Sequence, residues 1–165
     1  AHGIDLAPEA ADLGAQMLAS WGTSANLETG SMDDLPWPDE SFHVVIDVFS
    51  ANCLDSTSFA KCLREITRVL KSGGIFFTHT PSKRSDDFLY PGPSAMIDSN
   101  TLSGIHRDDA VFAGNHYPFR FSHPRELTQQ LNEVGLTVEY METLSRTYNG
   151  GQDHFEFIIA EASKS

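Results

Sequence analysis

The chain has 165 residues, 40% of them hydrophobic, and 23 acidic against 11 basic side chains give it a formal net charge of −12. This length predicts a single domain over residues 1–165 with a substantial core. The acidic balance and the lack of any basic run disfavour binding to nucleic-acid backbones or to anionic membranes.

The two cysteines and the distribution of apolar residues indicate a compartment. Cys53 and Cys62 are too few for a disulfide framework and lack metal-ligand spacing, so we expect buried thiols. The sequence shows neither a charged leader followed by an apolar run nor an apolar stretch of membrane-spanning length. It therefore predicts a soluble, cytoplasmic protein.

The first half of the chain alternates predicted strands and helices. Pro8 and Glu9 suit the first turn of a helix. The continuous β-branched run at 44–46 is typical of a strand covered on both faces, as in a parallel sheet. We expect strands at 3–6, 25–29, 44–48 and 75–80, and helices at 8–21 and 56–71.

The second half ends in a predicted hairpin. Pro124 opens a helix that Gly135 stops. Alternating apolar residues then predict strands at 136–140 and 155–159, separated by the turn at 149–151. We expect these two strands to pair antiparallel at the edge of the sheet.

Between the two halves lies a long segment, 83–121, rich in Asp, Ser, Gly and Pro and interspersed with aromatic side chains. A connection of this length is usually functional or partly disordered. Its aromatics either form a lid over a substrate or anchor the segment to the core. Phe119 and Phe121 favour an edge strand.

Three motifs in order carry a resemblance to a known family. They are GIDLAPE at 3–9, the loop and strand GSMDDLPWPDESFHVVID at 30–47, and LKSGG at 70–74. This pattern resembles class I S-adenosylmethionine-dependent methyltransferases. The resemblance implies an α/β fold: a truncated Rossmann-like methyltransferase sheet, mostly parallel with an antiparallel C-terminal hairpin, flanked by helices.

The resemblance also implies site residues and S-adenosylmethionine as cofactor. Asp5, followed by Leu6, matches the acid that binds the ribose hydroxyls; read from the residues alone, it is an acid at a helix entry. Ser31 and Met32 match an Asp-Ala pair at the adenine, and Asp33 or Asp34 is placed to compensate for the missing acid.

Asp47 and Phe49 follow the strand at 44–48, where the family places residues that line the transferable methyl group. Asp47 either orients or deprotonates a substrate, or it caps local backbone. Asn52 and Cys53 replace a His-His pair of many relatives. His79 faces the crevice or is structural.

The family's front end is not matched. No Gly-x-Gly occurs in the chain, so the Gly-rich cofactor turn and its strand are absent. In the family this strand separates the strands at 3–6 and 44–48. We expect these two to pair directly, in flavodoxin-like order, with a crevice at their carboxyl ends.

The remaining histidines do not predict a metal site. His106, His116 and His123 are widely spaced and lie in or beside the long segment. Metal ligands are normally fixed on rigid elements at short spacing.

Three interpretations of function remain open. The first is a methyltransferase that acts on a small molecule, contacted by residues 83–121. The second is an inactive remnant that binds a ligand or a protein partner, for example as a homodimer. The third is a fragment of a longer enzyme.

Overall fold

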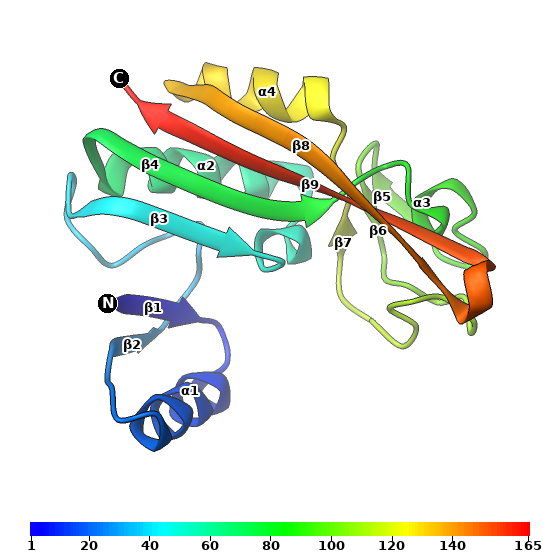
Figure 1. The fold of residues 1–165 in the computed structure, drawn as a ribbon, viewed down its shortest axis with the longest axis horizontal. Helices are drawn as coiled ribbons and strands as arrows, with labels where there is room; N and C mark the ends of the chain where they lie inside the picture. Colours follow the sequence, from blue (N-terminus) through cyan, green and yellow to red (C-terminus); the bar gives the residue numbers. More distant parts are fainter.

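The computed structural model describes residues 1–165, and its strands form three sheets (Figure 1). The first sheet pairs β1 (His2–Asp5) with β2 (Asn26–Thr29) in parallel, with helix α1 (Pro8–Ser20) beside them. The pairing runs from His2 opposite Asn26 to Asp5 opposite Thr29. Helix α1 starts at its proline, as expected, but none of its residues is buried. Its apolar stripe, with Leu13 and Met17, is exposed.

The central sheet has the order β3-β4-β9-β8. Strands β3 (Phe42–Val48) and β4 (Leu70–Pro81) are parallel, whereas β8 (Leu136–Tyr148) and β9 (Asp153–Lys164) form an antiparallel hairpin joined through η2 (Asn149–Gly151). The predicted hairpin at the sheet edge is therefore confirmed, although both strands extend well beyond the predicted bounds. β9 is antiparallel to β4.

Helices α2 (Ser56–Val69) and α4 (Pro124–Glu133) cover one face of this sheet. Helix α2 begins at Asp55, whose carboxylate accepts a hydrogen bond from the Ser58 amide at 2.8 Å. The main core combines apolar residues of both helices with residues of β4, β8 and β9. Its helical members are Phe59, Cys62, Leu63, Ile66, Leu127 and Leu131.

The opposite face of the sheet is open along β3. Val44, Ile46 and Val48 are 51%, 67% and 51% exposed, and the neighbouring Ile75 on β4 is 44% exposed. The prediction of a strand covered on both faces is wrong for these residues, because neither α1 nor another helix reaches this face.

The segment 83–121 folds as a small unit against the far half of β9 (Figure 1). It contains α3 (Asp86–Leu89) and a sheet of β5 (Met96–Asp98), β6 (Thr101–Leu102) and β7 (Phe119–Arg120). Aromatic side chains of this segment form a second core with Phe155 of β9. Phe119 lies in an edge strand, as expected, and the aromatics anchor the segment. None of the helices combines the length and apolar character needed to cross a membrane.

The expected pairing of the strands at 3–6 and 44–48 is wrong. β1 pairs with β2 and β3 pairs with β4, and their facing edges carry no ladder between them. Three aromatic rings pack together where the two strands begin. They belong to His2 of β1, Trp37 of the loop and Phe42 of β3, and their centroids lie 5.1 to 5.8 Å from one another. Aromatic rings in edge-to-face contact fill the space that direct backbone pairing would need.

Candidate cofactor and substrate site

One arginine fixes the loop that leads into β3. Arg68 of α2 donates to the carbonyl oxygens of Leu35 and Trp37 at 2.9 and 2.7 Å. It also forms ion pairs with Asp39 and Glu65 at 2.9 and 2.7 Å. Glu65 in turn accepts the Leu35 amide at 2.9 Å, and its hydrogen bonds with Arg68 lower its pKa. The two prolines prevent helix here, and Arg68 supplies partners for the extended backbone.

Asp5 lies at the carboxyl end of β1 and is exposed. Its Oδ1 accepts the amide of Ala7 at 2.9 Å, which is the helix-entry contact expected from the residues alone. Its other carboxylate oxygen, Oδ2, accepts no hydrogen bond from the protein. Leu6 follows with its side chain 75% exposed, so it packs against nothing that would fix it.

The residues after β2 form a compact turn. The Ser31 hydroxyl donates to the Asp33 carboxylate. Met32 packs against the main core and lines the pocket between β1 and β3. Ser31 and Asp33 are thus brought together, with the acid moved two positions along the chain from where the resemblance expects it.

Asp47 is the buried carboxylate of the site, only 9% exposed at the end of β3. Its Oδ1 accepts the amides of Ser50 and Ala51 at 3.2 and 3.0 Å, and its Oδ2 accepts the Thr78 hydroxyl at 2.9 Å. These bonds begin η1 (Ala51–Cys53) and tie it to β4. The geometry is that of a local backbone cap; a catalytic role for Asp47 stays a prediction.

A pocket of about 580 Å³ separates β1 from β3. Thirteen of its 17 lining residues are hydrophobic, and they come from β1, the 30–41 loop, β3 and the buried side of α2. Ile4, Met32, Asp47 and Ser50 are among its lining residues. A volume of this size suits a small ligand. The lining contains no lysine or arginine.

Phe49 adopts a left-handed backbone with φ +59°, which is uncommon for an aromatic residue and occurs mainly at tight turns or functional sites. Its amide donates to the carbonyl of His79 at 2.9 Å. The centroid of its ring lies 4.9 Å from that of Phe112 and 5.7 Å from that of Phe157. Phe49 thus packs against the second core. Phe49 therefore points toward the 83–121 segment.

Cys53 is exposed, whereas Cys62 is buried, and both thiols are free. The expectation of two buried thiols is wrong for Cys53, which follows the turn that Asp47 caps. Desolvation, followed by the charges of Asp47 and Asp5, raises the pKa of Cys53. The charges of Asp5, at the end of β1, and of Asp47, at the end of β3, thus both contribute to this shift.

The other candidates occupy structural positions. His79 packs edge-on against Phe157, with Nε2 buried and without a partner. Asn52 is buried in η1. The rings of His106 and His116 lie 5.7 Å apart, and no third metal-ligand side chain joins them. His123 accepts the Arg125 amide at 3.3 Å and caps α4.

Sequence reasoning missed the buried polar residues that lock the 83–121 segment to the core. Arg120 is 1% exposed, lies 3.6 Å from the centroid of the Phe59 ring and donates to Ser122 and Gln130. Burial lowers its pKa to about 10. The sequence signal for this buried arginine is its place between two apolar residues, Phe119 and Phe121.

A second link comes from Asp98. Its carboxylate accepts both the amide and the hydroxyl of Ser56, each at 2.9 Å, and the Asn100 amide at 2.8 Å. Burial alone would raise its pKa, but these hydrogen bonds lower it. Asp98 thus fixes β5 to the first turn of α2.

Comparison with known proteins finds similar sequences and similar folds. Residues 1–74 match the family model described as a methyltransferase domain. The sterol 4-C-methyltransferase of Caenorhabditis elegans is 30% identical over 86 residues, which are 51% of this chain and 25% of that protein. The demethylmenaquinone methyltransferase of Deinococcus radiodurans is 27% identical over 149 residues, 84% of this chain and 58% of that protein. The chain thus spans between a quarter and three fifths of these relatives.

Solved structures share the fold. A S-adenosylmethionine-dependent methyltransferase of Methanosarcina mazei superposes with a TM-score of 0.78 at 17% identity, over 99% of this chain and 81% of that one. The 1,6-didemethyltoxoflavin-N1-methyltransferase of Burkholderia thailandensis, solved with S-adenosylhomocysteine, gives a TM-score of 0.63 at 15% identity, over 99% and 61%. Residues 1–74 are thus similar to a methyltransferase domain, and the whole chain has the fold of solved S-adenosylmethionine-dependent methyltransferases.

Proposed function

We propose that the chain contributes to methyl transfer from S-adenosylmethionine to a small molecule. The observation that carries this proposal is the apolar pocket between β1 and β3, which is lined by Ile4, the residue before Asp5, and by Asp47 at the end of β3. Its relatives include enzymes named for a sterol, for demethylmenaquinone and for a didemethyltoxoflavin, all small molecules. The free thiols suit a reducing cytoplasm.

The residues present fit the adenosine end of the cofactor. The free oxygen of Asp5 is available to a ribose hydroxyl. The turn at Ser31 offers the Asp33 carboxylate as an acceptor for the adenine amino group, and Met32 supplies apolar contact to the ring. Leu6 lies beside Asp5, where it would cover the ribose.

The methionine end has no such partners. Its carboxylate requires a cation or several amide donors, and the pocket lining contains neither lysine nor arginine. The residues present therefore fit the adenosine half of the cofactor, and the pocket lining offers no cation to the methionine carboxylate.

The bound cofactor would supply an electrophilic methyl group on a positively charged sulfur. The chain's own residues would orient the two reactants, since methyl transfer can proceed by positioning alone. Because both oxygens of Asp47 already accept hydrogen bonds, a positioning role suits it better than proton abstraction.

Calorimetric titration with S-adenosylhomocysteine tests the proposal. We expect micromolar to millimolar binding, loss of binding in Asp5→Ala, and about ten- to a hundredfold tighter binding in Ser31→Asp, which restores a charge-assisted bond. Asp12→Ala, an exposed acid on α1, is the matched control and should bind as the wild type does. Equal affinity in all four proteins would show that the adenosine site is unused.

A second candidate function rests on the unpaired edges of β1 and β3. Open edges with exposed Val44 and Ile46 invite strand addition, here by a second copy of the chain. Light scattering should then find a dimer that Val48→Lys disrupts without changing affinity for S-adenosylhomocysteine, because Val48 is 51% exposed and does not line the pocket. If light scattering finds only a monomer at a protein concentration of about 1 mM, the dimer hypothesis is excluded.

A further inference from the structure

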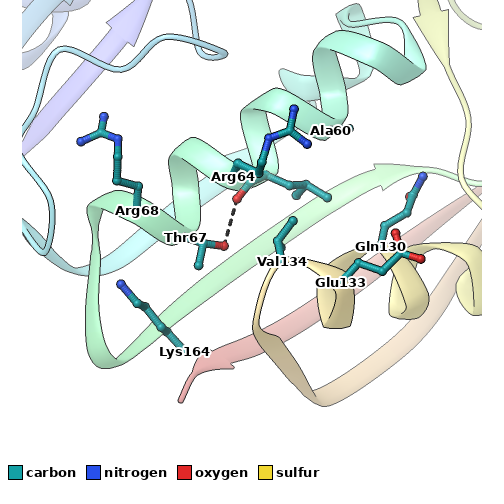
Figure 2. A pocket seen from close by; sticks show the side chains of 9 residues that line it. Ala60, Arg64, Thr67, Arg68, Gln130, Glu133, Val134 and Lys164 are labelled. Atoms are coloured by element: carbon teal, nitrogen blue, oxygen red, sulfur yellow. Dashed lines mark hydrogen bonds between the residues drawn. The ribbon is translucent and has the colours of Figure 1, made fainter.

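A groove between α2 and α4 shares no lining residue with the pocket of the candidate site (Figure 2). It has a volume of about 690 Å³. Arg64, Thr67 and Arg68 line it from α2, Gln130 and Glu133 from α4, and Lys164 from the end of β9. None of the residues assigned to methyl transfer borders this groove.

The groove concentrates basic side chains on a strongly acidic protein. The chain has 11 basic residues against 23 acidic ones. Lys61, Arg64 and Arg68 follow one another at spacings of three and four along α2, which places them on one stripe of the helix. Lys164 comes from β9, across the groove.

Most of these charges have no acidic partner. Arg68 is paired with Asp39 and Glu65, but Arg64 and Lys61 form no ion pair or side-chain hydrogen bond. The ammonium group of Lys164 donates only to the backbone carbonyl of Leu70, at 2.7 Å. An unpaired guanidinium such as that of Arg64 presents its donors in a fork that matches a carboxylate.

The floor of the groove adds apolar contact. Ala60 and Val134, both half-buried, lie among the lining residues, between the charged side chains. Only Glu133 contributes an acid to the lining. A basic rim over an apolar floor, between two helices, matches an amphipathic segment whose polar side chains are acidic.

We propose that this groove docks an acidic amphipathic segment of a partner protein, with its carboxylates at Arg64 and Lys164 and its apolar side chains on Ala60 and Val134. Nucleic acid does not fit equally well. A phosphate backbone needs a longer run of cations, and the overall charge of −12 would repel it outside the groove. A short segment gains from the local charges alone, since other charges are screened beyond about 8 Å at physiological salt.

The test uses the intact chain labelled with ¹⁵N and a synthetic 14-residue helical peptide of Glu, Leu and Ala as probe. We expect amide shifts confined to 60–68, 130–134 and 164, with affinity falling as salt rises. Arg64→Glu combined with Lys164→Glu should weaken binding at least tenfold. Arg146→Glu, a matched charge reversal on β8, should leave affinity unchanged.

Because the Arg64 side chain has no partner and lies on the surface, its reversal should not disturb folding, and the unchanged spectrum of the free variant checks this. No shifts at millimolar peptide, or equal weakening by the Arg146 variant, would overturn the proposal. Equal shifts with a peptide carrying Lys in place of Glu would also overturn it, because charge would then play no part. Preferential binding of a short oligonucleotide would show a polyphosphate site instead.

Discussion

Removal of the Asp47 carboxylate should show whether this residue is chiefly a structural cap. Asp47 accepts three hydrogen bonds, two of them from partners shielded from solvent, the Ala51 amide and the Thr78 hydroxyl. A hydrogen bond to a charged group contributes about 1.5–3 kcal/mol, offset here by the relief of burying a carboxylate. Asp47→Ala should therefore lower the free energy of unfolding by about 2–4 kcal/mol.

Asp47→Asn should cost much less, about 1 kcal/mol. The amide oxygen of asparagine can still accept from the backbone at η1, and the Thr78 hydroxyl can rotate to accept from the amide nitrogen. Urea unfolding followed by tryptophan fluorescence gives the free energies by linear extrapolation, provided that the slope is unchanged. Asp12→Ala is the control and should stay within about 0.5 kcal/mol of wild type. A cost below about 0.5 kcal/mol for Asp47→Ala would refute the capping role.

Three further predictions address other parts of the molecule. Arg68→Met should accelerate hydrogen exchange of the Leu35 amide about tenfold or more while α2 keeps its protection; unchanged exchange would mean that the loop is held otherwise. Asp98 has its pKa lowered below 3.8 in the folded state, so the stability it adds is present above pH 3.8 and is lost as the pH falls through the folded pKa. Asp98→Asn should accordingly destabilise the protein at pH 7 and less so below pH 3.8, and urea titrations in which the difference stays constant would contradict this. Cys53 should react with a thiol reagent at pH 8, and it should react faster in Asp47→Asn. Cys62, whose pKa is raised to about 12 by burial, should react only on unfolding. Equal reaction rates for both thiols would contradict the exposure of Cys53 and the burial of Cys62.

Local chemistry accounts for most of the elements that the sequence predicted correctly. Pro8 starts α1 and Pro124 starts α4, because a proline suits a first helical turn. Gly135, with φ +86°, follows the end of α4, and Asn149 to Gly151 turn the C-terminal hairpin. Each of these signals lies within a few residues of the structure that it specifies.

Motif order likewise indicated which residues to examine, but not what they contact. Asp5 and Asp47 were expected at the ends of their strands and lie there. Whether a carboxylate caps a turn or faces a ligand depends on neighbours such as Thr78, which is 31 positions away in the chain. The contacts of Arg120 and Arg68 are equally long-range, so periodicity could not reveal them.

The sequence by itself determined the alternation of strands and helices, the C-terminal hairpin and the resemblance to methyltransferases, because these follow from backbone propensities, apolar spacing and short motifs. Only the tertiary structure decided that β1 and β3 stay apart. Their separation depends on three rings from distant positions, His2, Trp37 and Phe42, and on Arg68 fixing the loop between them. Sheet pairing requires two backbone edges to approach within about 5 Å, and side chains that no local pattern places together prevent that approach.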